Sequence, residues 1–401
     1  MTKTLLISPK YPLPEDNGSA IRSMNFVRYF KQYGTVDILC LSSQKPSSLS
    51  KSPFTQEYFI TKPTDKACKK GFVKSIYDKL IHKKTWLTNF FVPKTEIAIR
   101  DIILAENYDY IVCRYIQSAY PLLKCSTNNK KKIILDVDDI VTETLYDSST
   151  ANINGFGTLK KLIDRYILQK YYKSCFGFGF ILFSSHLDKI KVSNPNLVSK
   201  CYVVPNVSPR MELPDDFCKD GHSNIRNILF VGSLAYEPNL QGIIWFIKEV
   251  FPRMVEEYED VRLVIVGKCP PAELINLTQN TPNVELNADS PDVVPFYNKC
   301  GVVIVPLFAG GGTRLKILES GVAGRPVIST EIGAYGLGLT DEKNVMIFSD
   351  PECFIEKYKK LSNDKKHYSR IVQNLSNVIT NNYSFTNFSE SMDTVLSNVH
   401  M

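Results

Sequence analysis

Three glycines and two cations follow a short apolar run in the second half of the chain. The glycines occupy positions 310–312, Thr313 is placed to cap the next helix, and Arg314 and Lys316 fall in its first turn. Glycine lets the backbone come close to a ligand, and the free amides at the start of a helix attract anions. Because cations are unfavourable in the first turn of a helix, their placement predicts a phosphate-bearing ligand. The alternative is a flexible turn followed by a solvated helix start.

Glu319 lies two helical turns beyond the glycines and is placed to accept hydrogen bonds from ribose hydroxyls. We therefore expect one segment to bind a phosphate-bearing ligand through Gly311, Gly312, Thr313, Arg314, Lys316 and Glu319.

A second glycine turn lies near the start of the chain. Residues 12–18 (PLPEDNG) lead from an apolar run into a helix that is expected to open at Ser19. A tight turn and a helix start suit a phosphate or a reacting sugar, so Gly18 is a candidate ligand contact. The alternative is an ordinary strand-to-helix loop.

Three carboxylates stand at the end of the apolar run that begins near residue 132. Asp136, Asp138 and Asp139 are expected to repel one another, which would raise the pKa of at least one of them and suit proton handling. Asp138 is the candidate for orienting or deprotonating an acceptor hydroxyl. In the alternative interpretation, Asp136 caps a turn and Asp139 pairs with a cation such as Arg114 or Arg165.

Both halves of the chain alternate apolar runs with segments of helical periodicity. In the first half, strands are predicted at 4–8, 36–41, 110–113, 132–136, 180–184 and 202–204, and helices at 19–33 and 94–107. In the second half, strands are predicted at 227–231, 261–266, 284–286, 302–306, 326–329 and 345–348, and helices at 239–257, 291–298 and 314–323. Near-continuous apolar strands separated by helices indicate parallel sheets covered on both faces. The predicted fold class is α/β, with two Rossmann-like doubly wound domains facing across a cleft.

Several segments together resemble the family-4 retaining glycosyltransferases, the group 1 glycosyl transferases, which have the GT-B fold. The resemblance rests on NILFVGSLAYEPN (227–239), RLVIVG (262–267) and KILESGVAGRPV (316–327), and on residues 8–19 and 203–206. It covers nearly the whole chain and is weakest at residues 45–100. It implies a nucleoside diphosphate sugar as donor and a glycan or a lipid-linked molecule as acceptor.

The resemblance also implies roles for single residues. Glu319 matches the second glutamate of the family's Glu-x7-Glu motif, which holds the donor ribose. The first glutamate would fall at Gly311 and is absent, a departure shared by a branch of the family with an Arg/Lys-bearing glycine turn. Gly232 matches a glycine where the first strand of the C-terminal domain approaches the donor phosphates. Gly18 matches the loop that covers the donor diphosphate from the other domain. With this resemblance, Arg314 and Lys316 are assigned to the donor diphosphate, and because they would stabilise its charge as it departs, they are candidate catalytic residues.

The domain boundary is expected in the polar, proline-bearing stretch 205–224. We assign residues 1–205 to an N-terminal, acceptor-side domain and residues 206–382 to a C-terminal domain that binds the nucleotide sugar. Residues 383–401 are predicted to form a C-terminal helix that packs back toward the N-terminal domain.

The composition is that of a globular protein large enough for two domains. The chain has 401 residues, of which 44% are hydrophobic and 22% charged. Its start is too short in apolar residues for a secretory signal, and no run reaches about 20 apolar residues, so a cytoplasmic protein is expected. The ten cysteines form no Cys-x-x-Cys pair and the five histidines no cluster, so neither a metal nor another cofactor is expected.

Eight lysines crowd residues 62–84, among apolar residues at four-residue spacing that aromatic residues follow up to position 91. This composition is typical of a helix on an anionic membrane surface, so residues 62–91 predict a peripheral contact with the inner face of a membrane. The alternative is a helix that buries its apolar stripe. No nucleic-acid recognition motif occurs, so nucleic acid is not an expected partner.

The sequence therefore predicts a hexosyl-type glycosyltransferase of cell-surface polysaccharide synthesis, for capsule or lipopolysaccharide. Two alternatives stay open. One is a GT-B-fold nucleotide-sugar epimerase, and the other is a catalytically impaired nucleotide-binding protein, which the missing glutamate at Gly311 would explain. A dehydrogenase is disfavoured because no Gly-x-Gly-x-x-Gly follows either first strand.

Overall fold

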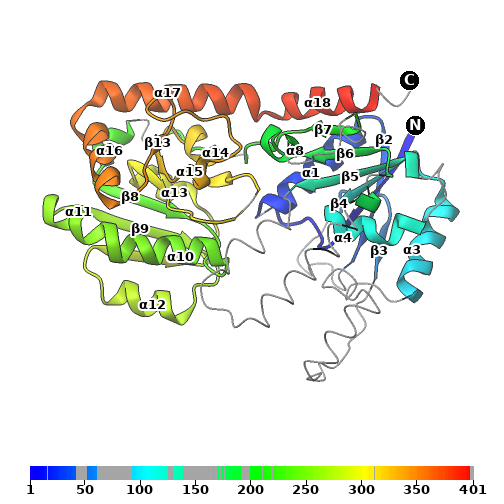
Figure 1. Ribbon diagram of the computed structural model, residues 1–401, viewed down its shortest axis with the longest axis horizontal. Coiled ribbons are helices and arrows are strands. Elements are labelled where there is room, and N and C mark those ends of the chain that lie inside the picture. Colours follow the sequence, from blue (N-terminus) through cyan, green and yellow to red (C-terminus); the bar gives the residue numbers. More distant parts are fainter. Residues whose placement is uncertain are drawn as a thin grey trace. The chain divides into compact units, whose positions relative to one another are not determined.

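The computed structural model divides into two compact units, which are described separately (Figure 1). Unit 1 comprises Met1–Val207 and Phe388–Met401, and unit 2 comprises Ser208–Asn387. The structure describes residues 1–15, 17–41, 52–60, 93–124, 130–138, 166, 170, 173–175, 177–190, 199–209, 211–217, 220–310 and 312–397.

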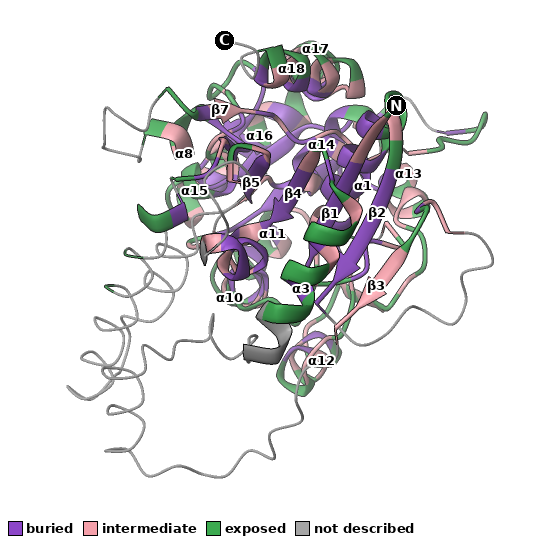
Figure 2. Ribbon diagram, turned by 90° about the vertical axis from the view of Figure 1, so that its right-hand side faces the viewer, coloured by how far each residue is buried: buried purple, intermediate pink, exposed green. Residues whose placement is uncertain are grey.

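Unit 1 is built on a seven-stranded parallel sheet in the order β3-β2-β1-β4-β5-β6-β7. The strands are β1 (Thr2–Ser8), β2 (Gly34–Cys40), β3 (Glu57–Phe59), β4 (Tyr110–Arg114), β5 (Ile133–Asp138), β6 (Phe180–Phe183) and β7 (Cys201–Val203). Its helices include α1 (Gly18–Lys31), α3 (Pro93–Glu106), α4 (Tyr115–Ala119), α8 (His186–Ile190) and the end of α18 (Phe385–Ser397). The central strands are buried, whereas the edge strand β3 is only half-buried (Figure 2).

Unit 2 has a six-stranded sheet in the order β10-β9-β8-β11-β12-β13, again parallel throughout. The strands are β8 (Asn227–Val231), β9 (Arg262–Gly267), β10 (Val284–Ala288), β11 (Val302–Val305), β12 (Val327–Ser329) and β13 (Met346–Ile347). The helices include α10 (Glu237–Trp245), α11 (Phe251–Glu257), α12 (Ala272–Gln279), α13 (Val294–Lys299), α14 (Leu315–Val322), α15 (Glu331–Ala334), α16 (Pro351–Asn363) and α17 (Lys365–Asn382). Both units therefore confirm the predicted α/β class with doubly wound parallel sheets.

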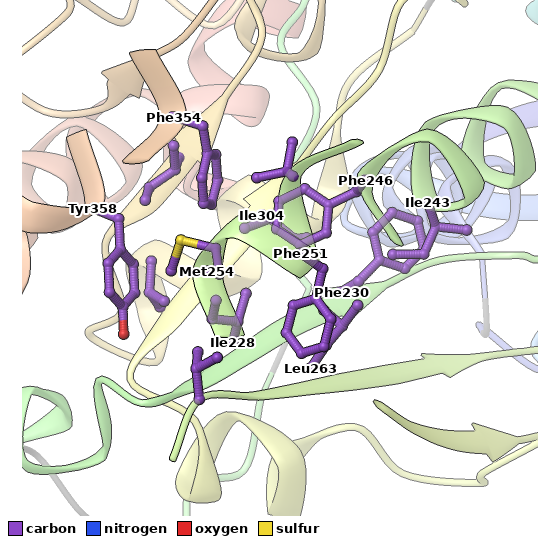
Figure 3. Close-up of a cluster of buried hydrophobic side chains, with 14 of the residues drawn as sticks. Ile228, Phe230, Ile243, Phe246, Phe251, Met254, Leu263, Ile304, Phe354 and Tyr358 are labelled. Atoms are coloured by element: carbon purple, nitrogen blue, oxygen red, sulfur yellow. The ribbon is translucent and has the colours of Figure 1, made fainter. Parts of the chain in front are cut away.

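Alternating residues of β8 supply the two cores of unit 2. Ile228 and Phe230 belong to one buried cluster, and Leu229 and Val231 belong to the other. Successive side chains of a strand point to opposite faces, so an apolar strand of this kind needs a cover on both sides. Figure 3 shows the first cluster, which joins Ile228 and Phe230 of β8 with side chains of α10, α11 and α16.

The predicted helix at 239–257 is confirmed, and its middle is a π-helical turn. This turn, Phe246–Val250, lies between α10 and α11, and Pro252 stands at the start of α11. Proline has no N–H to donate to the preceding turn, and a π-turn is a common way for a helix to absorb such an irregularity. The helical segment therefore changes its hydrogen-bonding pattern without ending.

A glycine brings α17 close to α14, the helix that follows the glycine turn. A Cβ atom at Gly321 would lie 2.5 Å from Cγ1 of Ile379, so a larger residue would fit only if the Ile379 side chain or α17 moved. Ser376 of α17 also donates a hydrogen bond to the carbonyl of Gly321, at 2.6 Å. These contacts fix the position of α14, and with it the side chains at its start.

Candidate functional site

In each sheet the strand order reverses between two neighbouring strands, which are β1 and β4 in unit 1. In unit 2 the reversal lies between β8 and β11, which pair directly. Ligands of doubly wound sheets bind beyond the carboxyl ends of the strands at such a point. Gly232 follows β8, and the segment 306–314 with the glycine turn follows β11. The predicted contacts of unit 2 thus gather at the place where the fold binds ligands.

Lys316 is the central cation of this site, and its side chain is buried. Its ammonium donates to Oδ1 of Asn239 at 2.9 Å and lies 4.4 Å from the centre of the Phe230 ring. Asn239 in turn donates from Nδ2 to the carbonyl of Ser233, at 2.9 Å. Across the described parts of the chain, no carboxylate oxygen lies within 4.0 Å of the Lys316 ammonium. The charge of Lys316 is therefore held in place without a direct counter-ion.

Burial, together with the nearby charge of Arg314, lowers the pKa of Lys316 from its usual 10.5 to about 7. Removing an ammonium from water disfavours its charged form, and a neighbouring cation adds to that effect. A bound anion would act in the opposite direction and restore the charge. These surroundings would favour an anionic ligand, whose binding here stays a prediction.

Gly232 makes room for this arrangement. A Cβ atom there would lie 2.8 Å from Nδ2 of Asn239 and 3.0 Å from the Lys316 ammonium. Any side chain at Gly232 would push against both groups. Glycine at this position therefore keeps the backbone after β8 open beside the buried cation.

Arg314 folds back onto the glycine turn. Its guanidinium donates to the carbonyls of Gly310, at 2.7 Å, and of Gly312. Both glycines have positive φ angles, 107° and 74°, which residues with side chains rarely adopt. The arginine therefore closes the turn across two carbonyls, and Gly311 between them lies outside the described residues.

The prediction that Thr313 caps the helix is wrong. Helix α14 begins at Leu315, and its N-cap is Arg314, with φ −80° and ψ 86° and no side-chain hydrogen bond to the first turn. The chain is still non-helical at Arg314, so the helix starts one residue later than a Thr313 cap requires. Thr313 is half-buried beside the turn, and its assignment to the ligand stays a prediction.

Glu319 lies one turn after Lys316 on α14 and is partly buried. Its Oε2 atom accepts a hydrogen bond from the hydroxyl of Tyr297, at 2.9 Å. Burial raises the pKa of Glu319, while the Tyr297 hydrogen bond and the charge of Lys316 act against that rise. Residues three apart on a helix share a face, so Lys316 and Glu319 lie together on one side of α14.

In unit 1, Gly18 opens α1 directly after the loop that follows β1. Asn17 is the N-cap, and its Oδ1 atom accepts from the amide of Ala20 at 3.1 Å. The first turn of α1 contains no acidic residue. Gly18 is thus the first residue of a capped helix, one residue before the predicted start at Ser19, and its contact with a ligand stays a prediction.

Asp136 lies within β5 and does not cap a turn, as the alternative interpretation had it. It is completely buried between two buried arginines, accepting from Arg22 at 2.9 and 2.6 Å and pairing with Arg114. Arg22 also donates to the carbonyl of Val204 and to Oδ1 of Asn206, each at 2.9 Å. The sequence interpretation missed Arg22, although an arginine on the apolar face of an amphipathic helix was a usable signal.

Asp138 ends β5, and the structure describes its backbone but not its side chain. Asp139 and Arg165, which we considered as members of an ion pair, lie outside the described residues, as does the whole basic stretch 62–91. Within the described ranges, no group of three or more His, Cys, Asp or Glu residues is arranged to hold a metal ion. None of the described helices is long and apolar enough to cross a membrane.

Comparison with known proteins gives a match for part of unit 2 and relatives for the whole chain. Residues 225–364 match the family described as Glycosyl transferases group 1. A protein of Klebsiella pneumoniae, described as an uncharacterized 44.6 kDa protein in the cps region, is 26% identical over 400 residues, which cover 96% of this chain and 95% of the relative.

Two solved structures share the fold over nearly the full length. Anabaena HepE in complex with UDP-glucose has a TM-score of 0.69 and 13% identity, covering 99% of this chain and 100% of that one. WaaG, a glycosyltransferase involved in lipopolysaccharide biosynthesis, has a TM-score of 0.63 and 14% identity, covering 98% and 99%. At these identities, the two similarities establish the two-domain fold.

Proposed function

We propose that this glycosyltransferase of the GT-B fold, whose residues 225–364 form a Glycosyl transferases group 1 domain, transfers a hexosyl group from a nucleoside diphosphate sugar. The acceptor would be a glycan or a lipid-linked molecule, the configuration of the transferred sugar would be retained, and the product would be a cell-surface polysaccharide such as capsule or lipopolysaccharide. The enzyme would need no metal ion.

The observation that carries this proposal is the buried ammonium of Lys316. It is held 2.9 Å from Asn239 Oδ1, next to Gly232, without a carboxylate partner in the described residues. A diphosphate supplies the missing negative charge, and it carries more of that charge as it leaves the sugar. An ammonium fixed in advance in a buried site stabilises such a developing charge efficiently.

The relatives agree with this reaction class. HepE is solved in complex with UDP-glucose, WaaG belongs to lipopolysaccharide biosynthesis, and the Klebsiella relative is encoded in a cps region. A uridine donor and a capsule or lipopolysaccharide acceptor are therefore the first to test.

The proposed residues divide the work of the reaction. In unit 2, Lys316 and Arg314 stabilise the departing diphosphate, Glu319 accepts from the ribose, and the other diphosphate contacts are Gly232, Gly311, Gly312 and Thr313. The bond between the anomeric carbon and the phosphate oxygen breaks, and a bond to the acceptor oxygen forms. The acceptor proton passes to the departing phosphate oxygen, while Asp138 orients the acceptor hydroxyl.

A nucleotide panel tests the donor site. We would measure the thermal shift caused by UDP, GDP, ADP, CDP and dTDP, with EDTA present, for the wild type, Glu319→Ala and Glu256→Ala. Glu256 is an exposed acid on α11 and serves as the matched control. We expect one nucleotide to stabilise the wild type and the control but not Glu319→Ala. No shift with any nucleotide would overturn the proposal.

The membrane contact through residues 62–91 is a separate proposal that rests on their composition. Replacing the eight lysines by glutamine should abolish binding to vesicles that contain anionic lipid and should leave donor binding unchanged. Equal sedimentation of both proteins with such vesicles would rule this contact out.

A further inference from the structure

Tyr297 of α13 is completely buried, although its side chain ends in a polar group. A buried hydroxyl has to find a partner inside the protein, because leaving it unpaired costs about 1–3 kcal/mol. The hydroxyl of Tyr297 donates to Oε2 of Glu319 at 2.9 Å, and the carbonyl of Lys316 lies 3.3 Å away. The shorter contact to a carboxylate is the stronger one.

This hydrogen bond occupies one oxygen of the Glu319 carboxylate. Among the described residues, Tyr297 is the side chain that donates to Glu319, and Oε1 receives no hydrogen bond. Glu319 is only partly buried, in contrast to Tyr297. The carboxylate is thus held at one oxygen and has its other oxygen available as an acceptor.

Tyr297 is itself held rigidly. The fully buried guanidinium of Arg325 donates from Nε to the carbonyls of Tyr297 and Cys300, at 2.8 Å each, and packs 5.0 Å from the centre of the Phe217 ring. The backbone of α13 is therefore fixed at Tyr297, which makes its hydroxyl a firm support for Glu319. A group that binds a ligand accurately needs a support of this kind.

From this geometry, we propose that Tyr297 is a positioning residue that makes the donor site selective for ribonucleoside over 2′-deoxyribonucleoside diphosphates. It holds the Glu319 carboxylate by Oε2, and Oε1 accepts from the ribose hydroxyls. The inference rests on the proposed function, in which Glu319 binds the ribose of the donor.

The charged groups around Glu319 support this role. Burial raises the pKa of Glu319, and Tyr297 from α13 and Lys316 from its own helix act against that rise by favouring the ionised carboxylate. Burial and the neighbouring carboxylate raise the pKa of Tyr297 well above its usual value, so its hydroxyl stays protonated and donates throughout the neutral range. Both neighbours therefore favour the form of Glu319 that only accepts hydrogen bonds, as recognition of a hydroxyl requires.

The test uses the ribonucleoside diphosphate that gives the largest shift in the panel above, together with its 2′-deoxy counterpart. We would measure the Kd of both for the wild type and for Tyr297→Phe, which removes a single oxygen atom. The affinity for the ribonucleotide should fall about tenfold, since a hydrogen bond to a charged group is lost, and the affinity for the deoxynucleotide should change less than twofold. The preference for ribose should thus disappear.

Tyr358→Phe is the matched control. Tyr358 is also completely buried in unit 2, and its hydroxyl donates to the carbonyl of Ile225 at 3.0 Å. This variant should keep the wild-type preference. The double variant Tyr297→Phe/Glu319→Gln should lose no more ribonucleotide affinity than Glu319→Gln alone, because both changes act on one interaction.

The outcomes separate the two proposals. A wild type that binds none of the nucleotides overturns the proposed function and this inference with it. A wild type that binds with a preference for ribose, and a Tyr297→Phe variant with the same preference, overturns only the inference. An equal loss of affinity for both nucleotides in Tyr297→Phe would show a structural role of the hydroxyl and would also overturn it.

Discussion

Gly232 lies beside the ammonium of Lys316: a Cβ atom at position 232 would be 3.0 Å from Lys316 Nζ. The two residues are far apart in the sequence, one after β8 and the other in α14. The end of β8 therefore lies next to the start of the helix that follows the glycine turn. The site therefore depends on a small residue in one segment and on a cation in another.

Gly232→Ala should weaken the binding of the donor and leave the stability of the protein nearly unchanged. The added methyl group would meet the ends of the Lys316 and Asn239 side chains, which can move, rather than the backbone. We expect a small change in melting temperature and a loss of about tenfold or more in donor affinity, as the hydrogen bond of a charged group is displaced. Gly177→Ala, at an exposed glycine of unit 1, is the control. Unchanged donor affinity in Gly232→Ala would contradict the assignment of Gly232 and Lys316 to the donor site.

Donor affinity should depend on pH through Lys316, whose pKa is lowered to about 7. The protonated form binds the diphosphate, so affinity should be highest below pH 7 and should fall above it, by about fivefold between pH 7 and pH 8 for one coupled proton. A nucleotide sugar is the right probe for calorimetric titration, because its diphosphate does not titrate near neutrality. Lys316→Met should bind weakly with little pH dependence. An affinity of the wild type that stays constant from pH 6 to pH 9 would refute this coupling.

Lys316→Met should stabilise the protein in the absence of donor. The lysine has a pKa near 10.5 when unfolded and about 7 when folded, so the unfolded chain binds the extra proton between these values. The wild type should therefore gain stability as pH rises from 7 toward 10, and should bear the full cost of the buried charge below pH 7. Lowering the pKa from 10.5 to about 7 corresponds to about 4–5 kcal/mol, and the variant loses the hydrogen bond to Asn239 and the contact with the Phe230 ring. At pH 7 we therefore expect a net gain of about 2 kcal/mol, a rise of roughly 4–8 °C in Tm for a unit of this size.

Lys357→Met provides the opposite comparison. Lys357 forms ion pairs with Asp341 and Glu342, both at 2.7 Å, so its removal should lower the melting temperature. If Lys316→Met melts at or below the temperature of the wild type at pH 7, the buried charge of Lys316 does not destabilise the folded protein, and the prediction is wrong.

The strands of both sheets were predictable because they are buried on two faces. The strand predicted at 227–231 is β8 with the same bounds, and most other strands differ by one or two residues. The strand β3 was missed because it has three residues and is only half-buried at the edge of the sheet, so it has no continuous apolar run. Burial on both faces leaves a pattern in the sequence, and an exposed edge does not.

The pairs that complete the sites could not be predicted in the same way. Tyr297 and Glu319 come from different helices, and Arg22 and Asp136 come from a helix and a strand far apart in the chain. Periodicity identifies which residues are buried, but it does not identify which buried polar groups meet. The sequence therefore indicated the glycine turn, whose members are contiguous, and missed the tyrosine and the arginine that come from elsewhere.

The buried group Arg22–Asp136–Arg114 predicts an uneven response to mutation. Its two arginines and its aspartate are all buried, and among the described residues the Asp136 carboxylate pairs with both guanidinium groups. Asp136→Asn would remove this shared partner from both arginines, and breaking a buried pair in this way costs about 3–5 kcal/mol. Arg114→Met would leave the ion pair of Arg22 and Asp136 intact and should cost much less. Chemical unfolding of the two variants, followed by circular dichroism, measures the difference. Equal losses would mean that the hydrogen bonds of Arg114, including the one to Ser23 at 3.0 Å, matter as much as the ion pairs of Asp136.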